Sequence, residues 1–250
     1  MQSKFIHHQG ASLHYQIGGK ESASVMVLLH GGFGSIVDFE PLLPHLLQHY
    51  RVIAVDTRGH GRSTLGTTAL TYAQAADDVR QILRNESVEN YSLFGFSDGG
   101  ITAYRLGAED ENVEKIITVG AEWHQKHLSG VREIFEAVNL DFVKKNLSGQ
   151  LAAYQADNPE PDVEKWAAAL RTMWLDESES GYPNESVREI TANVLAIRGE
   201  ADFLLAFDDW AELKTELPDV HLMNVPFAAH EAIKEQPEII WAAVQAFQAL

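Results

Sequence analysis

Short apolar segments alternate along this chain with longer segments whose apolar residues have helical spacing. Val25–Leu29 and Val52–Val55 are unbroken apolar runs, typical of strands that are buried on both faces. Tyr72–Leu83 has helical spacing, and Thr71 is suited to cap its N-terminus. Because parallel strands need long crossover connections, which are usually helices, this alternation predicts an α/β fold with a mainly parallel, doubly wound sheet.

The alternation continues to the end of the chain. We expect further strands at Tyr91–Phe94, Ile116–Val119, Val194–Ile197 and Val220–Val225, and further helices at Phe39–Tyr50, Ile101–Ala108 and Pro237–Leu250. Near the N-terminus, Gln9-Gly10 separates two runs of alternating residues, which predicts a hairpin turn.

The segment 123–190 interrupts this alternation. It has helical spacing at Val131–Leu147 and Val163–Leu175 and no run that resembles a strand. We therefore expect a core formed by residues 1–122 and 191–250. A helical insertion, residues 123–190, would follow the sixth strand of that core.

The composition limits the partners and the chemistry. There are 36 Asp and Glu residues against 19 Lys and Arg, a formal net charge of −17, which repels phosphate backbones and anionic lipids. We therefore expect a small-molecule substrate, with no nucleic acid and no membrane as partner, and a monomer or homodimer. The absence of cysteine excludes disulfides, thiolate metal sites and cysteine nucleophiles, and no motif indicates a metal or an organic cofactor. The first residues lack the apolar stretch of a secretory signal, which favours a cytoplasmic protein.

The motif with the clearest chemistry is Gly95-Phe96-Ser97-Asp98-Gly99-Gly100, which lies between an expected strand and an expected helix. In this context the G-x-S-x-G pattern predicts a sharp turn that presents a serine hydroxyl at the N-terminus of a helix. The small residues on either side avoid clashes with the neighbouring strand and helix. Ser97 is therefore the candidate nucleophile.

A second glycine-rich motif, His30-Gly31-Gly32-Phe33-Gly34-Ser35, follows the expected strand Val25–Leu29. Glycines at this place let a backbone N–H approach a reacting carbonyl. The N–H groups of Gly32 and Asp98 are candidates for an oxyanion hole, with Phe33 as the alternative to Gly32. The pattern fits neither a Rossmann nor a P-loop motif.

These motifs resemble those of the α/β-hydrolase superfamily over essentially the whole chain. The resemblance implies a catalytic triad of Ser97, Asp202 and His230, in the order found in that fold. It also identifies Asp56-Thr57-Arg58-Gly59-His60-Gly61-Arg62-Ser63 as a loop that is usually structural, so Asp56, Arg58 and His60 are given no catalytic role. Pro226-Phe227-Ala228-Ala229 stands where the family often has a glycine-rich turn.

Two alternatives among the titratable residues stay open. Glu122, after the strand Ile116–Val119, is a rival to Asp202 because some family members place the triad acid there. His124 and His127 could share a helix face and bind a metal, but we favour an ordinary surface pair.

The resemblance also implies that residues 123–190 form a cap over the active site. Phe33, Asp98, Trp123 and Phe227 are the candidate substrate-binding residues. Trp166, Met173 and Trp174 would either line the underside of the cap or form its own small core.

The stretch Gly-Phe-Ser-Asp-Gly-Gly-Ile-Thr is similar to that of valacyclovir-hydrolase-like enzymes, where the acid after the nucleophile is implicated in holding a substrate amino group. A serine nucleophile predicts hydrolysis of a small carboxylic ester, which could be an amino-acid ester, through an acyl-enzyme. The alternatives are an aminopeptidase of the proline-iminopeptidase type, a carbon–carbon bond hydrolase and a ligand-binding signalling member of the same fold.

Overall fold

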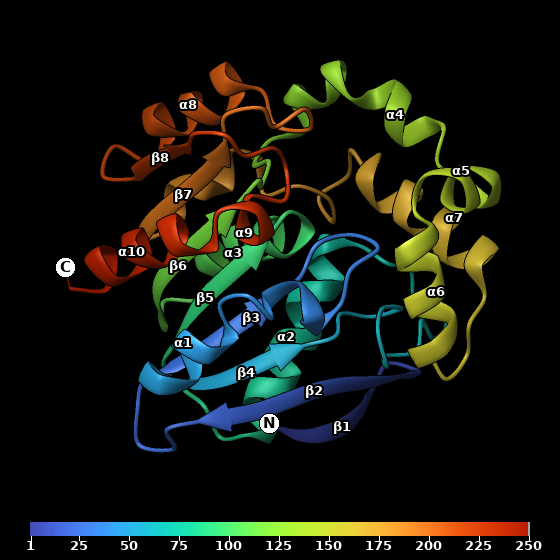
Figure 1. Ribbon diagram of the computed structural model, residues 1–250, viewed down its shortest axis with the longest axis horizontal. Coiled ribbons are helices and arrows are strands. Elements are labelled where there is room, and N and C mark those ends of the chain that lie inside the picture. Colours follow the sequence, from blue (N-terminus) through green and yellow to red (C-terminus); the bar gives the residue numbers. More distant parts are fainter. Residues whose placement is uncertain (250) are drawn as a thin grey trace.

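The eight strands form a single, mainly parallel sheet. The computed structural model describes residues 1–249. The strand order is β1-β2-β4-β3-β5-β6-β7-β8 (Figure 1). The strands are β1 (Gln2–His8), β2 (Ala11–Gly19), β3 (Val25–Leu29), β4 (Arg51–Val55), β5 (Tyr91–Phe96), β6 (Val113–Val119), β7 (Asn193–Gly199) and β8 (His221–Val225). Strand β2 runs antiparallel to β1 and β4, and the remaining pairs are parallel, which confirms the predicted fold class.

The N-terminal hairpin confirms the expected turn. Strands β1 and β2 pair from His8 opposite Ala11, so that Gln9 and Gly10 form a two-residue loop. Their φ angles are 44° and 77°. Positive φ at both loop residues is the conformation whose twist matches that of a two-stranded ribbon.

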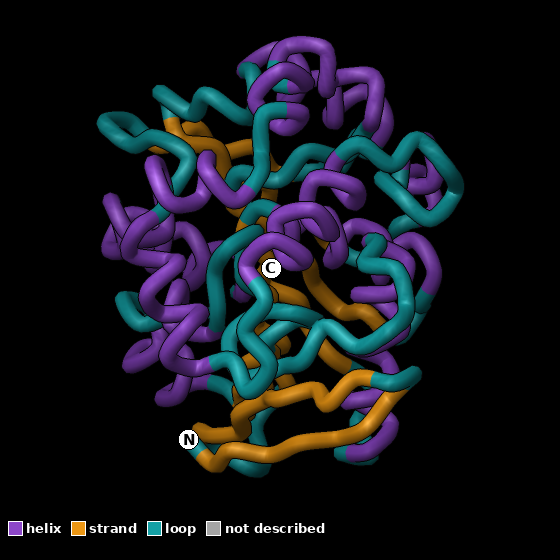
Figure 2. Tube along the Cα trace, turned by 90° about the vertical axis from the view of Figure 1, so that its right-hand side faces the viewer, coloured by secondary structure: helices purple, strands orange, loops and turns teal. Residues whose placement is uncertain are grey.

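Helices cover both faces of the sheet (Figure 2). The helices are α1 (Leu43–His49), α2 (Tyr72–Asn85), α3 (Asp98–Glu109), α4 (Arg132–Glu136), α5 (Leu140–Asn146), α6 (Ser148–Asp157), α7 (Val163–Trp174), α8 (Phe207–Glu216), α9 (Ala232–Glu235) and α10 (Pro237–Gln248), with 3₁₀ turns η1 (Ile36–Phe39), η2 (Gln125–Gly130) and η3 (Asn184–Glu189). One buried cluster joins the sheet to α2, α3 and α8, and a second joins it to α1, α9 and α10. As expected, the Thr71 hydroxyl caps α2 by accepting a hydrogen bond from the Gln74 N–H.

Some helix boundaries differ from those expected. The predicted helix Phe39–Tyr50 is the 3₁₀ turn η1 followed by the shorter α1, which has Pro44 in its first turn. Proline has no N–H and is best placed in the first turn of a helix, so α1 begins at Leu43, later than predicted. Helix α3 begins at Asp98 rather than at the predicted Ile101. Its first turn contains two glycines, which have no apolar side chain and therefore give no helical spacing of apolar residues.

The segment between β6 and β7 contains helices and 3₁₀ turns but no strand among the described residues. The predicted helix Val131–Leu147 is divided into α4 and α5, because the Asn139 side chain accepts a hydrogen bond from Phe142 N–H and starts a new helix there. Helix α6 in this segment, and α8 outside it, were not predicted.

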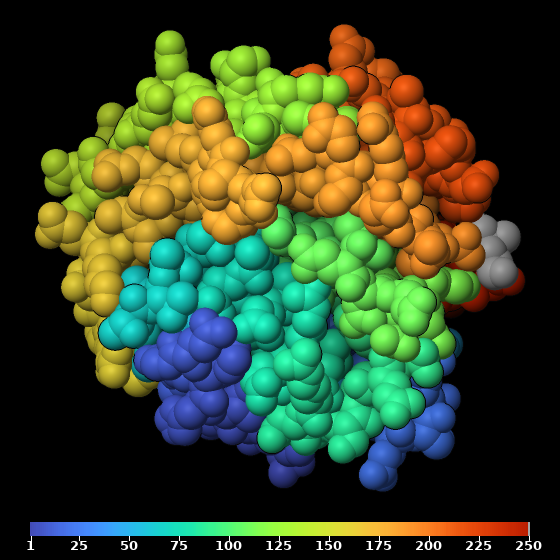
Figure 3. Space-filling view, turned by 180° about the vertical axis from the view of Figure 1, so that it is seen from behind, coloured from blue at the N-terminus to red at the C-terminus, as the bar shows by residue number. Residues whose placement is uncertain are grey.

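Helices α4–α7 gather at the end of the sheet toward which the arrowheads of the parallel strands point (Figure 1). Seen from behind, their side chains form a continuous surface with those of the core (Figure 3). No helix within residues 1–249 is long and apolar enough to cross a membrane.

Candidate active site

Ser97 lies in a strained turn between β5 and α3. Its φ and ψ angles are 51° and −118°, a conformation that non-glycine residues rarely adopt. A Cβ atom on Gly95 would clash with the carbonyl oxygen of Gly99, and one on Gly99 would clash with that of Leu29. These two positions therefore have to be glycine for the turn to form as it does. The turn leaves the Ser97 hydroxyl at the N-terminus of α3.

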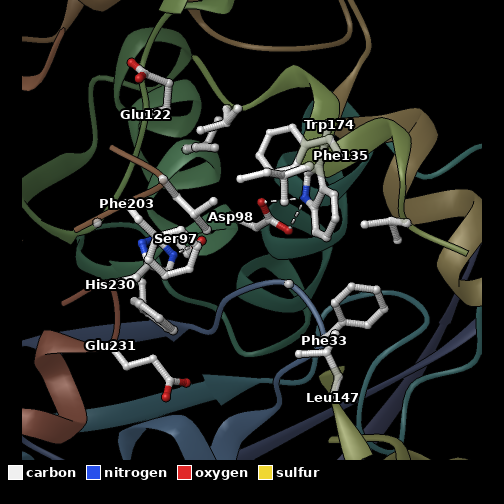
Figure 4. A pocket seen from close by; sticks show the side chains of 18 of the residues that line it. Phe33, Ser97, Asp98, Glu122, Phe135, Leu147, Trp174, Phe203, His230 and Glu231 are labelled. Atoms are coloured by element: carbon white, nitrogen blue, oxygen red, sulfur yellow. Dashed lines mark hydrogen bonds between the residues drawn. The ribbon is translucent and has the colours of Figure 1, made fainter. Parts of the chain in front are cut away.

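The structure brings Ser97, His230 and Asp202 together in a chain of hydrogen bonds. Figure 4 shows the first two of these residues, Ser97 and His230, at the cavity. His230 Nε2 lies 3.0 Å from Ser97 Oγ, and His230 Nδ1 lies 3.0 Å from both carboxylate oxygens of Asp202. With its proton on Nδ1, the imidazole donates to Asp202 and accepts from the serine hydroxyl. This arrangement suits a histidine that removes a proton from Ser97.

The loop that carries Asp202 is held by buried hydrogen bonds. Asp202 Oδ1 accepts from the backbone N–H groups of Leu204 and Leu205 at 2.9 and 3.1 Å. The guanidinium of Arg198, at the end of β7, donates to the carbonyl oxygens of Leu205 and Asp202. Arg198 is a residue that sequence reasoning missed, because an arginine in a buried strand carries no motif.

Glu122, the rival acid, contacts a different histidine. Its Oε1 lies 2.7 Å from His127 Nδ1 and also accepts from the N–H of Trp123. In Figure 4 its carboxylate points away from Ser97 and His230. The geometry thus pairs His230 with Asp202 and not with Glu122.

The amides proposed for the oxyanion hole lie beside Ser97. The backbone N–H groups of Gly32, Phe33 and Asp98 donate no hydrogen bond to another described residue. Phe33 has a φ of 59°, so the loop after β3 is locally strained as well. All three residues border the cavity that contains Ser97.

That cavity has a volume of about 410 Å³ and is bounded mainly by apolar side chains. The segment between β6 and β7 contributes most of them: Leu128, Val131, Ile134, Phe135, Val138, Phe142, Leu147, Trp174 and Tyr182. The charged residues of the wall are Asp98, Glu122, Glu231 and Glu235, and no Lys or Arg is among the described lining residues. The cavity is therefore apolar with an acidic border.

Asp98 is a half-buried carboxylate next to the nucleophile. Its oxygens accept hydrogen bonds from Trp174 Nε1 at 2.9 and 2.8 Å and from the Tyr72 hydroxyl at 2.8 Å. No Lys or Arg forms an ion pair with it among the described residues. Burial raises the pKa of Asp98 above its ordinary value, although the hydrogen bonds from Trp174 and Tyr72 favour the charged form.

Two of the four candidate substrate-binding residues do not border the cavity. Phe33 and Asp98 do, but Trp123 is buried elsewhere, with its Nε1 donating to the Asp209 carbonyl. Phe227 is 85% exposed and points into solvent, because it lies in a left-handed turn with a φ of 60°. The structure therefore does not bring Trp123 or Phe227 to the cavity, in contrast to the expectation.

Other aromatic residues occupy the places that Trp123 and Phe227 were expected to fill. Phe203 and Phe135 border the cavity close to His230 and Trp174. The position of Phe203 directly after Asp202 is a signal that could have identified it. Phe135 belongs to the short helix α4, for which the sequence has no comparable signal.

His124 and His127 do not form a surface pair. Each side chain is buried, and His127 lies between Glu122 and Glu212, with Nε2 2.9 Å from Glu212 Oε2. His124 Nε2 faces Glu185 at 3.1 Å. The two histidines therefore join the chain after β6 to α8 and η3.

A second Ser–His–Asp arrangement lies outside the cavity. His14 contacts Asp56 through Nδ1 and Ser3 through Nε2, both at 2.7 Å. Asp56 also accepts from the N–H groups of Ile36 and Arg62, so it organises the loop that follows β4. Ser3 lies in an extended, exposed strand without a helix N-terminus or a cavity, so this arrangement has a structural role.

Arg58 and His60 of the same loop are also structural. Arg58 is fully buried and forms an ion pair with Asp78, with Nη2 2.7 Å from Oδ1. Burial lowers the pKa of His60 to about 3, so its imidazole is neutral where it packs against Trp166.

Proteins of similar sequence and structure are hydrolases. A family model described as the alpha/beta hydrolase fold matches residues 24–139. A 2-(acetamidomethylene)succinate hydrolase from Mesorhizobium japonicum is 25% identical over 91% of this chain and 89% of its own. A 3-oxoadipate enol-lactonase from Acinetobacter baylyi is 27% identical over 92% of this chain and 90% of its own.

A solved structure extends this likeness to the fold. The crystal structure of the enol-lactonase from Burkholderia xenovorans covers 99% of this chain and 100% of its own, with a TM-score of 0.77 and 19% identity. The narrower resemblance to valacyclovir-hydrolase-like enzymes stays a prediction.

The contacts of His127 predict a pH-dependent contribution to stability. Burial alone would lower its pKa, but the hydrogen bonds and charges of Glu122 and Glu212, with Asp209 nearby, raise it above the ordinary 6.5. A histidine whose pKa is raised by folding stabilises the fold fully below its unfolded pKa. That contribution is lost as the pH rises through the folded pKa.

We therefore expect His127→Gln to lower the free energy of unfolding more at about pH 6 than at about pH 9. Urea denaturation of both proteins at the two pH values measures the difference. His7→Gln, at an exposed histidine of β1, is the control and should show no such difference. An equal loss at both pH values in His127→Gln would contradict the assignment.

Proposed function

The chain belongs to the α/β-hydrolase superfamily and is a hydrolase, and on this premise we propose that it cleaves a small carboxylic ester through an acyl-enzyme on Ser97. The observation that carries this proposal is the hydrogen-bonded chain from Ser97 to His230 to Asp202 at an apolar cavity. A lone serine hydroxyl is a poor nucleophile at neutral pH. A histidine base that a carboxylate holds in the correct tautomer makes it reactive.

The reaction proceeds by attack of Ser97 Oγ on the ester carbonyl carbon, while its proton passes to His230 Nε2. Asp202 stabilises the imidazolium that forms. His230 then protonates the departing alkoxide, which leaves an acyl group on Ser97. A water molecule that His230 deprotonates then attacks this acyl-enzyme. The bond between the acyl group and Ser97 Oγ breaks, His230 returns the proton to Oγ, and the acid is released. The negative charge on the carbonyl oxygen is stabilised by the N–H of Asp98 and that of Gly32 or Phe33.

The lining of the cavity supports a substrate that is not an anion. Four carboxylic residues border it and no Lys or Arg does so among the described residues, so a substrate carboxylate would lack a cationic partner. The two relatives are named for a derivative of succinate and for the enol-lactone of 3-oxoadipate, each of which carries at least one carboxylate. We propose that this chain differs from them and takes a neutral or cationic ester. The same argument disfavours a carbon–carbon bond hydrolase for dianionic substrates.

Residues 123–190 are proposed as a cap that selects the acyl group. They contribute the apolar wall opposite Ser97, including Phe135, Phe142 and Leu147. Caps over the carboxyl ends of the strands select substrates and exclude water. A cavity of about 410 Å³ suits a small ester.

A second candidate, an amino-acid ester as substrate, is favoured by the surroundings of Asp98. A carboxylate that is largely removed from water is normally paired with a cation, and the half-buried Asp98 has only the neutral donors Trp174 and Tyr72. A substrate ammonium group beside the scissile carbonyl would provide the missing positive charge.

Ser97→Ala is expected to lower kcat on p-nitrophenyl butyrate at least about 10³-fold, because the nucleophile is removed. It should also abolish labelling by a fluorophosphonate. Ser3→Ala is the matched control, since Ser3 also contacts a histidine that contacts an aspartate. Its turnover and labelling should equal those of the wild type. Labelling that persists in Ser97→Ala would refute the proposed mechanism.

Asp202→Asn is expected to lower kcat by about 10²–10⁴-fold, because the amide no longer stabilises the imidazolium of His230. Glu122→Gln removes the other candidate acid and should lower kcat less than about tenfold. Steady-state kinetics of the two variants on one ester separates the assignments. The reverse order of effects would make Glu122 the triad acid.

If Asp98 binds an ammonium group, an amino-acid ester should have a kcat/KM at least about tenfold above that of the ester without the amino group. The comparison uses the benzyl esters of valine and of 3-methylbutanoic acid, which differ only at the amino group. Equal kcat/KM values for the two esters would contradict binding of an ammonium group by Asp98 and would leave a neutral ester as the proposed substrate.

A further inference from the structure

Trp174, the last residue of helix α7, is hydrogen-bonded to the residue after the nucleophile. Its Nε1 lies 2.9 and 2.8 Å from the two carboxylate oxygens of Asp98, as the dashed lines in Figure 4 show. The backbone N–H of Asp98 is one of the two donors proposed for the oxyanion hole. The Trp174 indole therefore restrains the residue that supplies this donor.

The same indole packs over the loop that supplies the second donor. A Cβ atom on Gly32 would lie 2.6 Å from Trp174 Cζ2 and 2.6 Å from Asp98 Oδ2, so only glycine permits this approach. The rings of Trp174 and Phe33 meet edge to face with their centroids 5.5 Å apart. Phe33 needs such support because its backbone has a positive φ of 59°.

We infer that Trp174 is a positioning residue that holds both halves of the oxyanion hole, so that the cap segment completes the catalytic geometry and does not merely enclose the substrate. The inference rests on the proposed serine hydrolase function. It adds that the rate of the chemical step depends on a cap side chain that need not touch the reacting atoms.

The hydrogen bonds to Asp98 distinguish Trp174 from Trp166, which also lies in α7. Trp166 also packs edge to face on Phe33, with centroids 4.8 Å apart. Its Nε1, however, is buried without a partner among the described residues, and its ring stacks on Tyr154. Trp166 therefore packs against Phe33 but forms no hydrogen bond with Asp98.

This contrast provides a matched pair of variants, Trp174→Phe and Trp166→Phe. Each loses indole volume beside Phe33, but only Trp174→Phe loses the hydrogen bonds to Asp98. Displacing an oxyanion donor lowers transition-state binding more than substrate binding. We expect Trp174→Phe to lower kcat on p-nitrophenyl butyrate about 10- to 100-fold with less than about threefold change in KM. Trp166→Phe should stay within about threefold of the wild type in both.

A transition-state analogue tests whether displaced oxyanion donors cause the expected fall in kcat. A trifluoromethyl ketone with a butyl chain forms a tetrahedral oxyanion on a reactive serine. Its inhibition constant should rise in Trp174→Phe by the same factor by which kcat falls, which a loss of packing alone would not produce. Unchanged kcat in Trp174→Phe, or equal losses in the two tryptophan variants, would overturn the inference.

Asp98→Asn provides the second test if Trp174→Phe does not fold, as thermal melting would show. It keeps the backbone N–H but weakens the bond from Trp174, so kcat and analogue affinity should fall together. If both are unchanged, the inference fails. The proposed function fails separately, through turnover that persists in Ser97→Ala.

Discussion

The left-handed backbone of Ser97 determines where the other residues of the proposed triad have to lie. A φ of 51° at a non-glycine residue costs about 1–3 kcal/mol, which the surrounding structure has to offset. Part of that support is visible in the bond from Ser97 N–H to the Val119 carbonyl at 2.8 Å, which joins the turn to β6. Because the turn stands at the carboxyl end of a central strand, only loops from the same end of the sheet can reach Ser97. The loops after β7 and β8 do so and carry Asp202 and His230.

The position of Asp98 in the acidic border of the cavity follows from the same architecture. The carboxyl ends of parallel strands and the N-termini of the helices that follow them meet at one edge of the sheet. Acidic residues are favoured there by the helix dipoles. Asp98 is the first residue of α3. The helix N-terminus therefore stabilises a negative charge on Asp98 even without a bound substrate. The hydrogen bonds from Trp174 and Tyr72 stabilise this charge further.

Local signals explain how much of this could be predicted from the sequence. The hairpin at Gln9-Gly10, the buried strand Val25–Leu29 and the Thr71 cap each depend on a few adjacent residues, and each was found. The order of Ser97, Asp202 and His230 is not a local signal, and it was predicted from the resemblance to the superfamily. Trp123 and Phe227 were misplaced because their orientation depends on contacts with α8 and on a strained turn, which no spacing reveals. The link from Trp174 to Asp98 joins residues 76 positions apart, and it was equally invisible.

The attachment points of residues 123–190 show which part of the cavity wall is easiest to displace. After β6, His127 joins Glu122 to Glu212 of α8. Before α7, the Asn158 side chain donates to the carbonyl oxygens of Gly61 and Ser63 in the core. Trp174 then holds the end of α7 to Asp98. Helix α4 lies between these points and has no fully buried residue.

Helix α4 is therefore the least buried of the helices between β6 and β7. Its Ile134 borders the cavity and is 38% exposed, and across the cavity from this helix Phe203 is 66% exposed. Displacing half-exposed apolar side chains removes little buried area, so opening the wall between α4 and Phe203 costs less than lifting α7 from Asp98. A substrate that enters by that route leaves the hydrogen bonds from Trp174 to Asp98 in place. In this arrangement α4 is the exposed part of the wall that residues 123–190 contribute, whereas Trp174 is the part that contacts the proposed oxyanion donors.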